Sequence, residues 1–330
     1  MSGSRGRAVL FVAIQPRMFD DAERLTRGLE RLTAEDPTIV VQAHRQTGEV
    51  SVGGRGELHL EIVIDRLKRE FSVEADVGRP QVAYMEVLTR AADGESKYLK
   101  HVAGHAQYAH VKLRFIPARP GTGYVFVNGI AGGAIPAEFI PSVDEGIRAV
   151  LAHGMLAGHP IDGVRVHLLD GSYHDTDSTK EAFRLAGSMA ASDAVRKAAA
   201  VLYEPVMLME IDVPEEQVES LAADLAVRRG HVLSREDRDG TCVILARVPL
   251  AELFGYATAL RERTTGRGSV SMRFERYQPR HVAGEGDDSR DSLVGAPLEP
   301  VPSPRTSSIA MPEPDRGNEE DDDPNWLPVR

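Results

Sequence analysis

The sequence is poor in the residues that crosslink a chain or anchor it in a membrane. Its 330 residues include one cysteine, Cys242, one tryptophan, Trp326, and 5% aromatic residues. A single cysteine cannot form a disulfide within the chain, which is typical of a reducing compartment. We find no run of about 18 apolar residues that would span a membrane, and no apolar stretch of a signal peptide near the start. These absences predict a cytoplasmic protein without a membrane partner.

The negative charge is concentrated at one end of the chain. The formal net charge is −11, and residues 281–330 carry twelve acidic and four basic residues together with eight of the twenty prolines. A segment of this composition buries too little apolar surface to offset its chain entropy. We therefore predict a disordered acidic tail over 281–330. Residues 1–280 are close to charge balance and can still present basic patches.

Apolar periodicity in residues 1–83 predicts the order strand, helix, strand, strand, helix, strand. Ala8 to Ile14 is typical of a strand, and Asp20 with Glu23 indicates a helix start. Strands at 40–44 and 49–52 flank the hairpin signal Gln46-Thr47-Gly48. A helix with an apolar face from Leu60 to Phe71 and a strand at 73–77 complete the unit. This order is typical of a ferredoxin-like split βαβ sandwich.

The same order returns in residues 203–280, from a strand at 206–213 to a strand at 269–276. Residues 84–202 have a different pattern, with strands at 111–116, 124–127 and 164–169. Ser142 with Glu145, and Ser178 with Glu181, indicate the starts of two helices there. The expected fold class is α+β, with two split βαβ sandwiches flanking a different α+β domain.

Several collinear motifs resemble the third, fourth and fifth domains of translation elongation factor G. The motifs that carry this resemblance are Gly54 to Glu61 (GRGELHLE), Gly78 to Tyr84 (GRPQVAY), Asp170 to Asp175 (DGSYHD), Ala186 to Ala190 (AGSMA), Arg228 to Gly230 (RRG) and Pro249 to Thr258 (PLAELFGYAT). The resemblance spans about residues 8–280. It implies a third-domain-like unit at 1–83, an arm at 84–202 with a fold like domain 2 of ribosomal protein S5, and a fifth-domain-like unit at 203–280.

In that family the fourth domain is an arm that enters the ribosomal A site. The resemblance therefore implies the ribosome as the partner, through 16S and 23S rRNA, the A site and the GTPase-activating centre, and it implies no binding to DNA. The arm tip would be built from two loops. Its candidate contact residues are Gly104, His105, Ala106, Gln107, Ser172, Tyr173, His174 and Asp175.

Residue chemistry gives this assignment independent support. The 171–175 segment joins a strand to a capped helix, so its side chains should project from one end of the domain. Tyrosine and histidine can stack on unpaired bases, and hydroxyl groups can bond phosphate or sugar oxygens. The simpler alternative is an ordinary turn in which Asp175 or Asp177 caps the next helix.

Two catalytic or metal-binding interpretations are unfavourable. His101, His105 and His110 have no cysteine nearby, and Gly104 breaks any common helical face, so we expect no metal site. Ser172, His174 and Asp175 lie too close in sequence to form a serine–histidine–acid relay, and no G-x-S-x-G motif is present. We expect no catalytic residues.

The nucleotide chemistry of the family has no counterpart in this sequence. No G-x-x-x-x-G-K-[ST] phosphate loop is present. We therefore expect no nucleotide site, no enzyme activity and no cofactor in this chain. GTP would enter only through a separately encoded GTPase subunit.

The arm also departs from the family pattern G-G-R-G-Q-Y-G-H-V, because His105 replaces the arginine and Ala106 and Ala109 replace glycines. A histidine is mostly neutral at pH 7, and alanine lacks the freedom of glycine to take positive φ.

Three hypotheses remain open. The leading one is a ribosome-binding factor of the elongation factor G type, engaged in translocation or A-site binding. The alternatives are a ribosomal-protection factor that displaces an antibiotic, and a truncated remnant without function.

Overall fold

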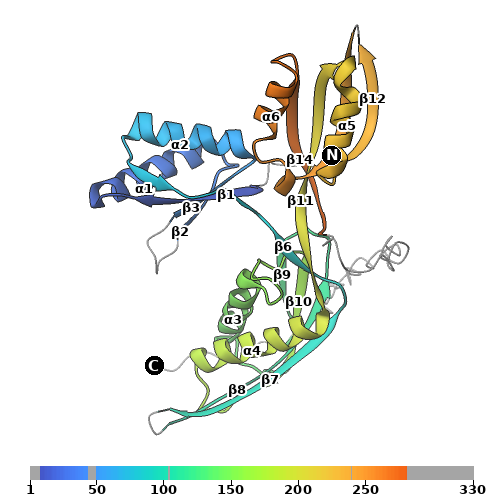
Figure 1. Cartoon of the computed structure of the whole chain (residues 1–330). Helices are drawn as coiled ribbons and strands as arrows, with labels where there is room; N and C mark the ends of the chain where they lie inside the picture. The colour runs from blue at the N-terminus through green and yellow to red at the C-terminus, as the bar shows by residue number, and fades with distance from the viewer. Residues whose placement is uncertain (1–7, 44–49, 103–104, 239, 281–330) are drawn as a thin grey trace, which may run out of the picture. The chain divides into compact units, whose positions relative to one another are not determined.

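A computed structural model describes residues 8–43, 50–102, 105–238 and 240–280 (Figure 1). It contains three antiparallel or mixed sheets with helices packed against them. The expected α+β class with two split βαβ units is confirmed. The hairpin turn expected at Gln46-Thr47-Gly48 and the tail at 281–330 lie outside the described residues. No described helix is long and apolar enough to cross a membrane.

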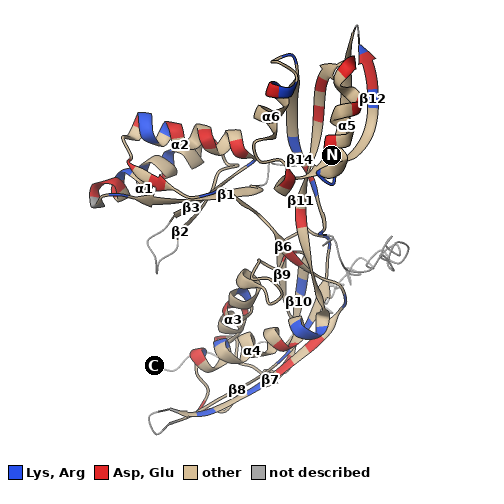
Figure 2. Ribbon diagram, viewed as in Figure 1, with Lys and Arg blue, Asp and Glu red and all other residues tan. Residues whose placement is uncertain are grey.

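The N-terminal domain is a sheet with two helices on one face. Its elements are β1 (Leu10–Pro16), α1 (Phe19–Glu35), β2 (Val40–Ala43), β3 (Val50–Gly54), α2 (Glu57–Phe71) and β4 (Ala75–Val77). The strand order is β2-β3-β1-β4, and the short β5 (Gln81–Val82) also pairs with β1. Alternate residues of β1 are buried under leucines of both helices, as expected for a half-buried strand. The exposed faces of α1 and α2 carry intermixed acidic and basic residues (Figure 2).

The arm domain is a four-stranded sheet covered on one face by two helices. Its elements are β7 (Ala92–Val102), β8 (His105–Pro117), β9 (Tyr124–Asn128), α3 (Ile140–His153), β10 (Val164–Ser172) and α4 (Lys180–Ala198). The strand order is β7-β8-β10-β9, with only β9 and β10 parallel among the described pairs. Alternate residues of β8 and β10 pack against the alanine-rich face of α4. The sequence patterns missed β7.

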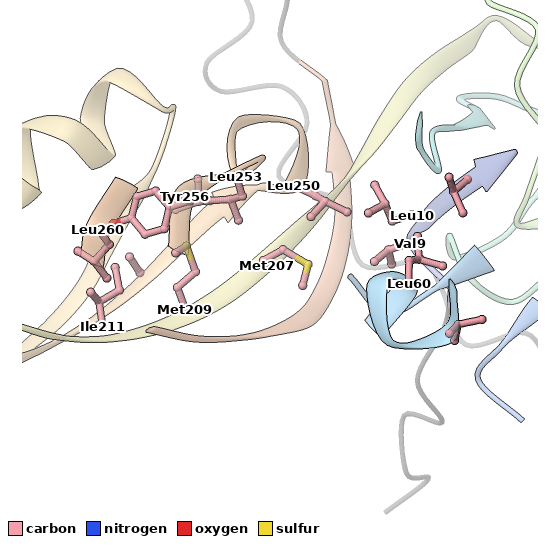
Figure 3. Close-up of a cluster of buried hydrophobic side chains, with 14 of the residues drawn as sticks. Val9, Leu10, Leu60, Met207, Met209, Ile211, Leu250, Leu253, Tyr256 and Leu260 are labelled. Carbon is pink, nitrogen blue, oxygen red and sulfur yellow. The ribbon is translucent and has the colours of Figure 1, made fainter. Parts of the chain in front are cut away.

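The C-terminal domain repeats the split βαβ order. Its elements are β11 (Ala200–Pro214), α5 (Val218–Val227), β12 (His231–Arg238), β13 (Thr241–Pro249), α6 (Tyr256–Arg263) and β14 (Ser269–Pro279). Short 3-10 turns at Glu215–Gln217 and Leu250–Glu252 precede the helices. Figure 3 shows Met209 and Ile211 of β11 beside Tyr256 and Leu260 of α6, and Met207 nearer Leu250. Cys242 lies in the same core, where 1% of its surface is exposed.

Strand β11 is longer than the sequence indicated. The expected strand began at Val206, whereas the observed strand begins at Ala200, because its first four residues pair with β6 (Met85–Leu88). The boundary expected between residues 202 and 203 therefore falls within a strand. The proposed division of the chain at 83 and 202 stays a prediction.

Three expected helix starts differ from the observed ones. Helix α1 begins at Phe19, so Asp20 lies in the first turn, where its charge is stabilised by the helix dipole. Helix α3 begins at Ile140, with Pro141 in its first turn and Ser142 buried inside it. The N-cap of α4 is Thr179 and not Ser178, because the Thr179 hydroxyl accepts the Ala182 N–H at 3.1 Å.

Candidate functional site: the end of the arm domain

The segment that follows β10 forms an exposed loop at one end of the arm domain. Strand β10 ends at Ser172, and α4 begins at Lys180. The expected strand-to-helix connection is therefore confirmed, but the expected loop is wrong for Ser172, which is the last residue of β10. Tyr173 is 41% exposed, and the side chain of His174 is 59% exposed. Both side chains are available to a partner in solution.

Tyr108 of β8 makes two hydrogen bonds to this loop and one to the last residue of β10. Its backbone N–H donates to the Asp177 carbonyl at 2.8 Å, and its own carbonyl accepts from the Ser178 hydroxyl at 2.8 Å. Its phenol oxygen lies 2.8 Å from the Ser172 hydroxyl. These bonds join residues about 70 positions apart, so the loop is fixed to the strand and not only to its own ends.

A second polar group extends from Ser172 across the open face of the sheet. The Ser172 Oγ lies 3.3 Å from Nδ1 of His110, whose Nε2 lies 2.7 Å from the Glu95 carboxylate. Lys112 is 3.6 Å from the same carboxylate. The hydrogen bond from His110, with the charge of Lys112, lowers the pKa of Glu95 below its usual value. Ser172, His110 and Glu95 thus link strands β10, β8 and β7 on the open face of the sheet.

Among the described residues, the His174 imidazole contacts two side chains of its own loop. Its Nδ1 lies 3.1 Å from the Thr176 hydroxyl and 3.3 Å from the Asp177 carboxylate. The alternative in which Asp175 or Asp177 caps α4 is wrong, since Thr179 takes that role. The rest of the imidazole ring is free to stack or to donate a hydrogen bond.

The other expected tip residues, 104–107, lie partly outside the described residues and partly in β8. Gly104 lies outside the described residues. His105 is the first residue of β8, and Ala106 and Gln107 also lie in that strand. The expected loop over 104–107 is therefore wrong for His105, Ala106 and Gln107, because antiparallel pairing of β7 and β8 continues to the Val102–His105 pair. The structure joins Ser172 to Tyr108 and His110. The sequence patterns did not place Tyr108 at the site, and they raised His110 only as a metal ligand.

The geometry suits binding and does not assemble a hydrolase relay. Ser172 bonds to Tyr108 and His110, whereas His174 bonds to Thr176 and Asp177. Ser172 and His174, two members of the apparent triad, thus belong to separate hydrogen-bond groups. No cluster of three or more metal-ligating side chains occurs among the described residues. What the site offers is an exposed imidazole and phenol on a loop fixed to a sheet.

Exposed lysines occur on β7, next to Tyr108 of β8, and at the start of α4. Lys97 of β7 is exposed, and its Nζ lies 5.5 Å from the centroid of the Tyr108 ring. Lys100, further along β7, and Lys180, at the start of α4, are also exposed. An anionic polymer could therefore meet positive charge beside the aromatic loop.

Three family models match consecutive parts of the chain. Elongation factor G domain III matches residues 6–79, elongation factor G domain IV matches residues 80–199, and the elongation factor G C-terminus matches residues 201–283. These matches define a protein made of translation-factor domains. Over residues 6–283 the chain belongs to the elongation factor G family.

A solved structure shares this arrangement over part of its length. A crystal structure of a protein from Thermus thermophilus is similar with a TM-score of 0.60 and 36% sequence identity. The match covers 83% of this chain and 41% of that chain. This chain thus corresponds to less than half the length of that protein.

Proposed function

We propose that this chain is a ribosome-binding factor of the elongation factor G type that inserts its arm domain into the ribosomal A site in the cytoplasm. The observation that carries the proposal is the exposed His174 on a loop fixed to β8 by Tyr108. An aromatic side chain held in one place can stack on an unpaired base at little entropic cost. The family membership supplies the class of partner.

The proposal extends to the surfaces that would contact the rest of the ribosome. The arm would face 16S rRNA at the decoding site, and the flanking domains would face 23S rRNA and the GTPase-activating centre. The 330 residues contain no phosphate-binding G-x-x-x-x-G-K-[ST] motif. We therefore propose that this polypeptide neither binds nor hydrolyses GTP, and that it binds passively or with a separately encoded GTPase subunit.

Co-sedimentation with vacant 70S ribosomes at two salt concentrations tests the proposal. Saturable binding that weakens with salt is expected, because phosphate contacts release counterions. The His174→Ala variant should bind about tenfold more weakly, on the scale of one lost base contact. His153→Ala removes an exposed histidine from the end of α3 and should bind like the unmodified chain.

Two results would count against the proposal. One is the absence of ribosome binding at low salt, and the other is equal binding by the His174→Ala and unmodified chains. Equilibrium dialysis against GTP tests the nucleotide part separately. One equivalent of bound GTP would contradict the proposed lack of a nucleotide site.

A further inference from the structure

The hydroxyl of Ser178 is not used by the helix that follows it. Thr179 caps α4 with its side chain, and its carbonyl accepts the Phe183 N–H at 3.1 Å. Thr179 therefore supplies the acceptors for the Ala182 and Phe183 N–H groups, and Ser178 supplies neither. Ser178, which is half-buried and precedes the N-cap residue, can therefore serve another role.

Ser178 instead joins the His174 backbone to strand β8. Its Oγ accepts the His174 N–H at 2.9 Å and donates to the Tyr108 carbonyl at 2.8 Å. Its own N–H donates to the His174 carbonyl at 3.1 Å. One residue therefore closes the 174–178 turn and attaches that turn to the sheet.

We propose that Ser178 is a positioning residue of the arm end, whose hydroxyl holds His174 against β8 so that the imidazole meets its RNA partner in one orientation. This inference rests on the proposed function, since it assigns Ser178 to the same site. Ser178 itself contacts no ribosomal group in this proposal and acts through His174.

The contacts indicate what losing the hydroxyl would change. Without it, the His174 N–H and the Tyr108 carbonyl each lose a partner, while the Tyr108 N–H remains bonded to the Asp177 carbonyl. The contacts of the His174 ring with Thr176 and Asp177 lie within the turn and move with it. The turn loses its attachment at His174, whereas the cap of α4 and the core beneath it remain intact.

Amide hydrogen exchange at His174 in the full chain tests the attachment without a ribosome. Ser178→Ala should accelerate exchange of the His174 amide by about tenfold, as expected for the loss of one hydrogen bond. Ser178→Thr, which keeps a hydroxyl, should restore slow exchange. Thr179→Ala, which removes the helix cap one residue away, should leave the His174 amide unchanged. Equal exchange in the Ser178→Ala and unmodified chains would overturn the inference.

Ribosome binding then tests whether Ser178 acts through His174. Ser178→Ala should weaken 70S binding about threefold to tenfold, within the range of one hydrogen-bond contribution. The same substitution in a His174→Ala background should cause no further loss. Additive losses would overturn the positioning role. If the unmodified chain does not bind ribosomes at all, the proposed function fails, whereas the amide exchange still decides whether the attachment exists.

Discussion

Glu86 of β6 illustrates how a fully buried charge is accommodated in the arm domain. Its side chain has no exposed surface, and it accepts backbone N–H bonds from Met155, Leu156, Ala157 and His159 at 2.7 to 3.3 Å. Desolvation acts to raise the pKa of Glu86, but these four amides outweigh it and the pKa lies below its usual value. The carboxylate therefore fixes the loop that follows α3.

Replacing Glu86 with glutamine tests this role at constant side-chain size. The Glu86→Gln change removes the charge and replaces one acceptor oxygen with an NH₂ group. Because an NH₂ group cannot accept hydrogen bonds, some of the backbone N–H groups that face it lose their partner. We expect a loss of about 2–4 kcal/mol in the free energy of unfolding, measured by urea denaturation. Glu138→Gln, on an exposed loop, should change the value by less than about 0.5 kcal/mol. Equal stabilities of the two variants would contradict the role of Glu86.

The lowered pKa of Glu86 also predicts a pH dependence. A carboxyl group whose folded-state pKa is depressed stabilises the protein above its unfolded pKa and loses that contribution as pH falls through the folded value. The stability difference between the unmodified chain and Glu86→Gln should therefore be constant above pH 4.5, the ordinary value for this group, and shrink below it. Denaturation curves between neutral and acid pH measure it. If the stability difference between the two chains grew as the pH fell, the predicted sign of the pH dependence would be wrong.

At the scale of elements, the arm depends on glycines that let α3, α4 and β7 approach closely. A Cβ at Gly146 of α3 would lie 2.1 Å from the Arg184 carbonyl, and one at Gly187 of α4 would lie 2.7 Å from the Val143 carbonyl. A Cβ at Gly94 of β7 would lie 2.0 Å from the Ala190 carbonyl. Each neighbour is backbone, so it cannot move away as a flexible side chain can.

Gly146→Ala is therefore expected to force the two helices apart. We expect a loss of about 2 kcal/mol or more in the free energy of unfolding, at the level of overpacked cores. The exposed neighbour Glu145→Ala, on the same helix, should remain within about 0.5 kcal/mol of the unmodified chain. Thermal denaturation followed by circular dichroism gives both values. If Gly146→Ala left the free energy of unfolding unchanged, α3 and α4 would not need the close approach that Gly146 allows.

Apolar periodicity explains which elements could be predicted from the sequence and which could not. The two split βαβ units were predictable, because leucine and valine recur with the periods of half-buried helices and strands. Strand β7 was not, because its inward positions include Gly94 and Ser96 and so show no apolar alternation. At the site, the loop that begins at Tyr173 was predictable, because the sequence placed it between a strand and a helix. The Tyr108–Ser178 contact could not be predicted, because no sequence pattern joins residues 70 positions apart.

At the scale of the whole molecule, charge should govern how fast the chain meets a polyanion. The net charge is −11, and residues 281–330 account for −8 of it. An acidic segment repels a polyanion such as RNA at distances shorter than the Debye length, about 10 Å at 0.1 M salt. Removing it should favour encounter without altering any described contact of the arm.

A chain ending at Arg280 should therefore associate with ribosomes several-fold faster at low salt, with the difference vanishing at high salt. Stopped-flow light scattering measures the association rate. A full-length variant with Glu319 to Asp323 replaced by glutamine and asparagine keeps the length and removes five charges. Its association rate should therefore lie between those of the full-length chain and the shortened chain. Identical rates for all three at low salt would contradict this electrostatic account.

The burial of Cys242 makes the chain a ready background for site-directed labelling. Burial, together with the neighbouring Asp237 carboxylate, raises the pKa of its thiol, so maleimide and nitroxide reagents should react with it slowly. Since the chain has no other cysteine, a Tyr173→Cys variant would carry one fluorophore or spin label on the exposed loop. Energy transfer from that label to a labelled ribosome would then report the position of the arm end directly, without removing any native cysteine first.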